Sequence, residues 1–419
     1  MRKVGIAVLA VLAALGVFAA GASPATQENG VTAKTITIGG TFPLTGAASL
    51  YATISTAMKA YFAYVNATKG PDGKRGVAGR QIVFKIYDDG YNPAMTIQQT
   101  RRLVEQDKVF AIVGALGTDH NLAIRPYLNQ NKVPQILNAS GATAWGADYK
   151  AYPWTAGWQP DYEFEARIYG KKIARNSPNA KIAVIYQNDQ YGKDLLRGLE
   201  AGLGDKAGNI VAKEAYEAPQ RDVRSQVAKL RASGATVFVV FATPAQAIQS
   251  LVLAKLLGWN PPVIYVNSVS GTDTFMTTAK NSGAGDLVER VFSVQYSKDP
   301  ANPAWDDDAG MKLYREVMSK YFPNGSSTTV QNNGLNLYGV AVAHAFTQLL
   351  RKAGATPTRA GLMKAVRSWN EANPFLLPGV KQRTSGTDQY VVNCERVIKY
   401  TNGVFQPVSR VQCDEEVSK

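Results

Sequence analysis

The sequence predicts an α/β protein made of two Rossmann-like lobes, each with a parallel sheet, joined by a hinge of three chain crossings. Apolar strand-length runs alternate with amphipathic helix-length stretches along most of the 419 residues, which is the pattern of βαβ units. This alternation pauses three times, near 152–160, 289–299 and 374–385. We interpret each pause as a passage of the chain between lobes, with a cleft between the two sheets.

The first residues are typical of a secretory signal. Positive charge at Arg2 and Lys3 precedes an apolar run over 4–20, and small residues follow. This pattern predicts a signal peptide over 1–22, cleaved after Ala22 or, alternatively, after Ala25. A membrane anchor would need a longer apolar run. Because no cysteine occurs before Cys394, and so none lies just after the apolar run, we expect no lipid anchor and a periplasmic location.

The strands and helices of the predicted lobes follow in order. Strands are expected at 35–38, 82–87, 110–113, 133–137, 182–186, 237–241 and 263–266. Helices are expected at 49–66, 94–106, 162–173, 223–232 and 245–257. The three pauses then give an N-terminal lobe of 34–157 plus 294–372, and a C-terminal lobe of 158–293 plus 373–415. Ligands of such sheets bind where the strands end at their carboxyl side.

Composition narrows the classes of function. The formal net charge is +14, but the basic residues are spread in short pairs. This distribution favours a solvated surface with mild attraction for anionic solutes and does not predict a nucleic-acid partner. The two cysteines, Cys394 and Cys413, are predicted to form a disulfide in an oxidising compartment, the alternative being two free thiols. Their neighbours suggest no metal site, and no cofactor motif is recognised.

Six motifs in register resemble the leucine/isoleucine/valine-binding protein family, the type I periplasmic binding proteins of ABC importers. The resemblance covers nearly the whole chain after the signal. The motifs are Ile-Thr-Ile-Gly-Gly-Thr-Phe-Pro-Leu-Thr-Gly (36–46), Gly-Val-Ala-Gly-Arg (76–80), Tyr-Asp-Asp (87–89), Lys-Val-Phe-Ala-Ile-Val-Gly (108–114), Tyr-Gln-Asn-Asp-Gln-Tyr-Gly (186–192) and Leu-Gly-Trp (257–259).

The resemblance implies a closing cleft in which the first lobe binds the ligand's carboxylate with backbone N–H groups and hydroxyls. Small residues and helix N-termini after two strands suit an anion. By position this role falls on Leu116, Gly117 and Thr118, and on Ala139, Ser140 and Gly141. Capping of the following helices is an alternative role for Thr118 and Ser140.

Aromatic walls of the cleft are implied at Tyr51 and Tyr191 by their positions in the family pattern, although ordinary packing is the alternative for any tyrosine. Trp158 in the first crossing, His120 and Thr243 are further candidates for ligand contact. A structural role in the hinge is the alternative for Trp158, and a place in the first helical turn is the alternative for His120.

The loop after Val266 departs from the family pattern. Amino-acid binders of this family commonly place an acid there for the ligand's ammonium, whereas this chain reads Asn-Ser-Val-Ser-Gly over 267–271, with Ser268 as the candidate contact. Burying an ammonium without a charged partner is costly. We therefore favour an organic acid, including aromatic acids, and keep amino acids and amides open. Asp119 or Asp189 could substitute for the missing acid, although each is also suited to a helix start.

Taken together, these observations predict a soluble, monomeric, non-catalytic protein that delivers a small ligand to the membrane permease of an ABC importer. Two alternatives stay open. The loaded protein could instead be presented to a membrane receptor as a sensor. A secreted enzyme on the same scaffold is the third reading, because fold alone does not fix function.

Overall fold

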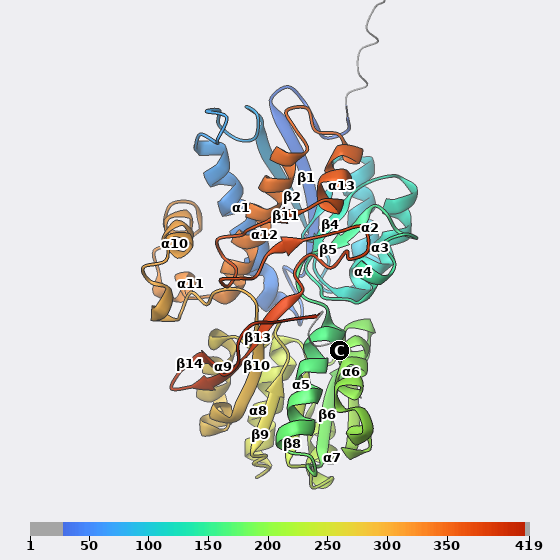
Figure 1. The fold of residues 1–419 in the computed structure, drawn as a ribbon, viewed down its shortest axis with the longest axis vertical. Coiled ribbons are helices and arrows are strands. Elements are labelled where there is room, and N and C mark those ends of the chain that lie inside the picture. The colour runs from blue at the N-terminus through green and yellow to red at the C-terminus, as the bar shows by residue number, and fades with distance from the viewer. Residues whose placement is uncertain (1–27, 415–419) are drawn as a thin grey trace, which may run out of the picture.

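A computed structural model describes residues 28–414 and shows two α/β bodies, one above the other in Figure 1. The predicted signal peptide, 1–22, lies outside the described residues. Each body has its own sheet with helices packed on it. The predicted fold class is therefore confirmed, and we call the two bodies the first and the second lobe.

The first lobe contains a five-stranded parallel sheet in the order β2-β1-β3-β4-β5. Its strands are β1 (Thr35–Phe42), β2 (Gln81–Asp88), β3 (Ile112–Val113), β4 (Gln135–Asn138) and β5 (Thr155–Gly157). Its helices are α1 (Ala52–Ala67), α2 (Pro93–Glu105), α3 (Thr118–Gln130), α4 (Ala144–Ala147), α10 (Ala309–Tyr321), α11 (Thr328–Gln331), α12 (Gly334–Lys352) and α13 (Arg359–Arg367).

The second lobe contains an eight-stranded sheet with the main order β14-β13-β10-β9-β8-β6-β7, and β15 pairs with β13. Its strands are β6 (Ile182–Gln187), β7 (Ile210–Tyr216), β8 (Val237–Phe241), β9 (Val263–Val266), β10 (Val291–Gln295), β13 (Cys394–Thr401), β14 (Val404–Pro407) and β15 (Gln412–Cys413). Its helices are α5 (Tyr162–Asn176), α6 (Gln190–Leu203), α7 (Arg224–Ala232), α8 (Pro244–Leu256) and α9 (Asp273–Ala279).

Shorter elements complete the chain. Turns of 3-10 type are η1 (Ser49–Tyr51), η2 (Gly204–Asn209), η4 (Gly285–Arg290) and η5 (Pro303–Trp305), and η3 (Lys280–Ala284) is a short π-type segment. The strands β11 (Asn370–Glu371) and β12 (Gln382–Arg383) form a small antiparallel pair. No helix within 28–414 is both long and apolar enough to span a bilayer.

The elements form where the sequence favours them. All five residues of β8 are buried, as expected of a strand with helices on both faces of its sheet. Asp161 and Asp189 cap the N-termini of α5 and α6, and each carboxylate accepts a backbone N–H of the first turn. The loops after β5 and β6 therefore lead directly into helices whose N-termini are capped.

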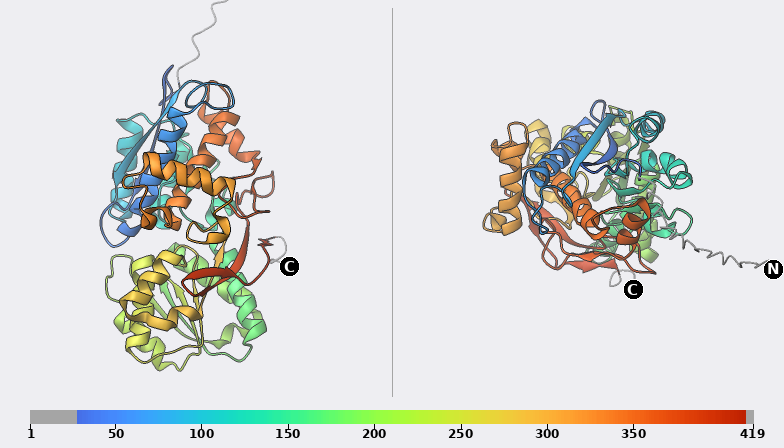
Figure 2. Two further views of the ribbon diagram at one scale, coloured as in Figure 1. Left: turned by 90° about the vertical axis from the view of Figure 1, so that its left-hand side faces the viewer. Right: turned by 90° about the horizontal axis from the view of Figure 1, so that it is seen from above.

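The chain passes between the lobes three times, as predicted. It leaves the first sheet after β5, returns after β10 to form α10–α13, and enters the second sheet again at β13. In this last passage β13 pairs antiparallel with β10, whereas β10 pairs parallel with β9. The passages lie close together between the lobes in Figure 2. The residue limits of the two lobes stay a prediction.

The disulfide between Cys394 and Cys413 is present, which confirms the predicted pairing. The two residues face each other on the antiparallel strands β13 and β15. Their sequence separation is 19, so the bond closes a short loop at the edge of the second sheet. It therefore fastens the last strands to the sheet.

Candidate functional site

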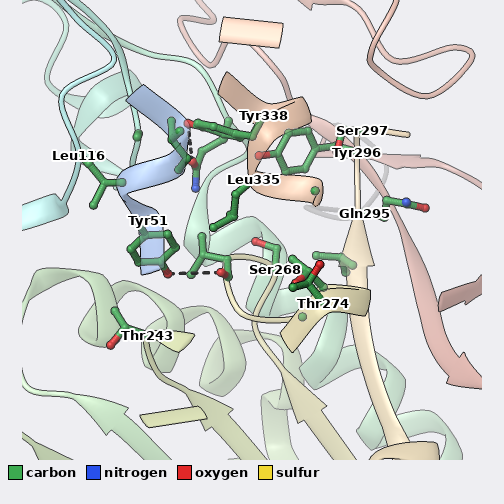
Figure 3. Close-up of a pocket in the computed structure, with 18 of the residues that line it drawn as sticks. Tyr51, Leu116, Thr243, Ser268, Thr274, Gln295, Tyr296, Ser297, Leu335 and Tyr338 are labelled. Carbon is green, nitrogen blue, oxygen red and sulfur yellow. Dashed lines mark hydrogen bonds between the residues drawn. The ribbon is translucent and has the colours of Figure 1, made fainter. Parts of the chain in front are cut away.

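A cavity of about 120 Å³ lies between the two sheets. The first lobe lines it with the loops after β1, β3 and β4 and with the start of α12, as Figure 3 shows for Leu335 and Tyr338. The second lobe lines it with the starts of α6 and α8 and with the segments after β9 and β10. The cavity thus lies at the carboxyl ends of strands from both lobes, where ligands of open parallel sheets bind.

Eight of the residues singled out in the sequence line this cavity. They are Tyr51, Leu116, Gly117, Thr118, Ala139, Tyr191, Thr243 and Ser268. Four others do not line it: His120, Ser140, Gly141 and Trp158. The loops after the strands therefore converge as expected, while some residues within these loops lie behind the cavity wall.

Gly117 precedes α3 as its N-cap, in a backbone conformation that favours glycine. Its φ is 103°, and a Cβ atom there would lie 2.4 Å from Nδ1 of His120. The absence of a side chain lets His120 fold back under the loop. The first turn of α3, which begins at Thr118, is thereby placed at the cavity wall.

Ser140 supports Thr118 from behind. Oγ of Ser140 lies 2.7 Å from Oγ1 of Thr118, and it accepts hydrogen bonds from the backbone N–H of Ala142 and from Nε1 of Trp145. A serine hydroxyl has two acceptor positions and one hydrogen. Either hydroxyl can be the donor within this pair, and the contact holds the Thr118 hydroxyl at the cavity wall.

Gly141, Trp158 and His120 have structural surroundings. A Cβ atom on Gly141 would lie 2.3 Å from the carbonyl oxygen of Pro160, so this glycine permits close packing beside the first crossing. The fully buried Trp158 donates from Nε1 to Oε1 of Gln382 at 2.8 Å. His120 stacks on Tyr91 with ring centroids 4.2 Å apart, and burial lowers its pKa. Of these rings, Tyr91 is the one that reaches the cavity.

Tyrosines form much of the cavity wall. Besides Tyr51 and Tyr191, the wall includes four that sequence reasoning missed: Tyr91, Tyr162, Tyr296 and Tyr338. The rings of Tyr162 and Tyr191 meet edge to face with centroids 5.1 Å apart. Burial raises the pKa of Tyr191 well above its ordinary value, so its hydroxyl stays neutral. That hydroxyl has no hydrogen-bond partner among the described residues.

The loop after β9 contains no acid over residues 267–271, but an acid from another element binds it. Glu165 of α5 accepts hydrogen bonds from the backbone N–H of Ser268 at 2.7 Å and from its Oγ at 2.6 Å. Glu165 itself does not line the cavity. Sequence reasoning did not select it, because an acid in the first turn of a helix commonly complements the helix dipole and gave no sign of a contact with the loop after β9.

Two acids that do line the cavity were also missed, Asp273 and Asp299. Burial and the neighbouring Asp299 raise the pKa of Asp273, so this pair holds a proton in the neutral range. Oδ1 of Asp273 accepts from the backbone N–H of Phe405, and Oδ1 of Asp299 from that of Ala301. The adjacent Lys298 donates to Asp308 at 2.6 Å instead.

Asp119 and Asp189, considered above as substitutes for the missing acid, lie outside the cavity lining. Asp189 caps α6 by accepting the N–H of Gly192 at 3.1 Å, and burial raises its pKa to about 6. Asp119, in the first turn of α3, accepts the N–H of Gln190 at 3.2 Å. Both carboxylates are thus engaged at helix starts, the role that the sequence offered as their alternative.

Comparison with known proteins agrees with this architecture. A family model described as periplasmic binding protein matches residues 35–403. The chain belongs to this family. Among curated proteins it is 25% identical over 313 residues to Leu/Ile/Val-binding protein homolog 7 of Brucella melitensis, covering 72% of this chain and 73% of that protein. The resemblance to the leucine/isoleucine/valine-binding family that the motifs indicated is confirmed.

Solved structures share the fold of this periplasmic binding protein. A branched chain amino acid ABC transporter protein from Thermus thermophilus with bound valine has a TM-score of 0.77 at 19% identity, over 91% of this chain and 97% of that one. A fatty acid ABC transporter substrate-binding protein from Thermomonospora curvata has a TM-score of 0.75 at 23% identity, over 94% and 96%. A solute binding protein from Rhodopseudomonas palustris BisB5 in complex with 3,4-dihydroxy benzoic acid has 0.74 at 19%, over 91% and 98%.

Proposed function

We propose that this periplasmic binding protein is the soluble substrate-binding component of an ABC importer, and that it binds a small organic acid or amino-acid-like ligand in the cavity between its lobes. The observation that carries the proposal is the cavity itself. It lies between the lobes, its walls come from both of them, and Thr118 lines it at the start of α3. A ligand held there would draw the lobes together.

The chemistry of the first-lobe wall supports an anionic group on the ligand. Thr118 begins α3, a helix of 13 residues, so the first backbone N–H groups of that helix lie beside the hydroxyl. Such groups and the positive end of the helix dipole favour a carboxylate. The ligand's acid group would therefore contact Leu116, Gly117, Thr118 and Ala139, with Ser140 acting through Thr118.

The size and the walls of the cavity support a compact ligand. A volume of about 120 Å³ is roughly ten times the smallest space that holds one water molecule. Tyrosine rings on both sides suit an apolar or aromatic body. Among the ligands in the solved relatives, valine and 3,4-dihydroxy benzoic acid are of this size class, whereas a long acyl chain would need the lobes to part further.

Transport is the use that we propose for the bound ligand. The relatives are named as binding proteins and transporter components, which supports a non-catalytic role. The loaded protein, a monomer in the periplasm after removal of residues 1–22, would dock on the membrane permease of its importer. Presentation to a membrane receptor is the second candidate, because it uses the same closed form. Neighbouring genes for a permease and an ATPase favour transport, and a neighbouring receptor kinase favours sensing.

The proposal is tested by a thermal-shift screen of the mature protein against carboxylates and amino acids, followed by calorimetry and small-angle X-ray scattering. We expect at least one small acid to raise the melting temperature and to reduce the radius of gyration. Thr118→Val, which keeps the shape but removes the hydroxyl, should lower its affinity, while the exposed Thr32→Val should not. A saturating ligand that leaves the radius unchanged would contradict cleft closure.

A further inference from the structure

Glu165 is a buried carboxylate directly behind the cavity wall. Its side chain is 1% exposed. Oε1 accepts hydrogen bonds from the backbone N–H of Ser268 at 2.7 Å and from the hydroxyl of Tyr169 at 2.8 Å, and Oε2 accepts from Oγ of Ser268 at 2.6 Å. Ser268 lies on the second-lobe side of the cavity, below Leu335 and Tyr338 in Figure 3. Glu165 therefore reaches the cavity only through Ser268.

A second buried acid shows which carboxyl carries a proton. Glu395 of β13 is fully buried, and neither of its oxygens has a hydrogen-bond partner among residues 28–414. Burial and the nearby Glu165 raise its pKa well above the ordinary value. A buried carboxylate without donors is far more costly than one with three. Burial raises the pKa of Glu165 as well, but the three donors that it accepts from lower it, whereas Glu395 has none. Glu395 therefore takes the first proton of this pair, and Glu165 is the carboxyl that stays ionised.

An ionised Glu165 fixes the direction of the Ser268 hydroxyl. A serine hydroxyl has one hydrogen, and Ser268 donates it to Oε2 of Glu165. Towards the cavity it can therefore only accept. The opposite wall has the reverse polarity, because the first backbone N–H groups of α3 lie there beside Thr118 and act as donors. The hydroxyl of Tyr51, like that of Ser268, uses its hydrogen within the protein, because it donates to the carbonyl oxygen of Val269 at 3.3 Å.

We propose that Glu165 is a specificity-determining positioning residue of the cleft, which makes Ser268 an acceptor and so selects ligands that carry a hydrogen-bond donor, an ammonium or hydroxyl group, beside their acid group. The inference rests on the proposed function. It revises the preference drawn from the loop sequence, because the acid that residues 267–271 lack is supplied from α5 through the serine hydroxyl. A hydroxy acid or an amino acid satisfies both walls, and a simple carboxylate leaves Ser268 unpaired.

The Glu165→Gln variant tests this directly. A glutamine amide oxygen can still accept the N–H of Ser268, but its NH2 group would then face Oγ and donate to it. Ser268 would release its own hydrogen towards the cavity and change from acceptor to donor. Glu395→Gln is the matched control, since it replaces a neutral buried acid of the same size by a neutral amide. Ser268→Ala removes the hydroxyl through which Glu165 acts.

The probes are two sets of three compounds that differ only in the donor. One set is L-leucine, 2-hydroxy-4-methylpentanoate and 4-methylpentanoate, and the other is L-phenylalanine, 3-phenyllactate and 3-phenylpropanoate. We expect the wild-type protein to bind a donor-bearing member at least about tenfold more tightly than its donor-free partner by calorimetry. Glu165→Gln should reduce that ratio about tenfold or invert it. Glu395→Gln should leave the ratio unchanged within about twofold. In the Ser268→Ala background, Glu165→Gln should have no further effect on the ratio.

Different results separate this inference from the proposed function. Equal binding of donor-bearing and donor-free members by the wild-type protein would overturn the role of Glu165 while supporting a carboxylate site. The same would follow if Glu165→Gln weakened all members equally, because a merely structural role lowers affinity without changing the ratio. A failure of every acid in the thermal-shift screen to bind would instead contradict the proposed function.

Discussion

The carboxylate of Asp119 accepts a hydrogen bond from the backbone N–H of Gln190 at 3.2 Å, and the two residues belong to opposite lobes. Asp119 lies in the first turn of α3, and Gln190 begins α6. A second bond runs in the other direction, from the N–H of Thr143 beside α4 to Oδ2 of Asp194 in α6 at 3.1 Å. Each lobe thus supplies an acceptor to an N–H group at a helix start of the other.

Asp119→Ala should weaken ligand binding by opening the lobes. Loss of one such hydrogen bond is worth about 1 kcal/mol, which corresponds to roughly a fivefold increase in the dissociation constant. Calorimetry with the best ligand of the screen measures the change, and scattering should show a larger radius for the unliganded variant. Asp119→Asn keeps an acceptor oxygen and should lose less affinity. Equal affinity in the alanine variant and wild type would show that the bond contributes nothing to closure.

Tyr191→Phe should lower ligand affinity without lowering the stability of the unliganded protein. The hydroxyl of Tyr191 is buried and unpartnered among the described residues, so its removal costs no internal hydrogen bond. If it donates to the ligand, we expect a loss of roughly tenfold in affinity. Thermal melting with and without ligand separates the two effects. A lower melting temperature without ligand would show that the hydroxyl has a protein partner after all.

Asp161→Asn should flatten the dependence of stability on pH. Burial raises the pKa of Asp161 from an ordinary value of 3.8 to about 7, although hydrogen bonds from Thr143 and the N–H of Glu163 oppose this. The folded protein therefore holds this proton more tightly than the unfolded chain. It follows that the free energy of unfolding falls as the pH rises from about 4 to about 7.

Urea denaturation between pH 4.5 and 8 measures that slope. Asparagine stays neutral throughout and can still accept the N–H of Glu163, so the variant should lose less stability over this range than the wild type. Asp205→Asn serves as the control, because the Asp205 side chain is 86% exposed. Parallel curves for Asp161→Asn and the wild-type protein would contradict the raised pKa.

Replacing both cysteines, Cys394→Ser with Cys413→Ser, should destabilise the protein without changing its ligand. A disulfide with a sequence separation of 19 is worth roughly 3 kcal/mol in the chain-entropy model. Chemical denaturation under non-reducing conditions gives the difference, and reduced wild-type protein should match the variant. A large loss of ligand affinity in a variant that remains folded would assign the bond a role in the cleft that its place at the sheet edge does not suggest.

Much of the fold was predictable because its strands are buried on both faces. All seven predicted strands coincide with observed ones, and the central β8 matches at both ends. The strands that were missed carry weaker patterns. In β7, at the edge of the sheet, the adjacent charged residues Lys213 and Glu214 interrupt the apolar run, and β5 is only three residues long. The antiparallel strands β13 and β14 lie outside the βα repeat, so its period could not reveal them.

The candidate site was predictable where it depends on position along the sheet. Thr118 and Ser268 follow strands directly, and topology brings such loops together. Glu165 and Asp299 could not be predicted in the same way, because Glu165 lies in the first turn of a helix and Asp299 in a chain crossing. Ser140 shows a third case. The loop of Ser140 was predicted correctly, but the Ser140 hydroxyl contacts Thr118 behind the cavity wall. Whether a residue of this loop lines the cavity or supports a neighbour depends on the direction of its side chain, which the position of the loop does not give.

The pairing of β10 with β13 has a consequence for the order of folding. These strands are about a hundred residues apart in sequence, and α10–α13 of the first lobe lie between them. The second sheet therefore cannot be finished by a ribosome-bound chain until residues beyond 394 have emerged, and loop closure over so long a segment is slow. Until then the second sheet ends at β10, whose outer edge presents unpaired backbone groups that β13 later covers.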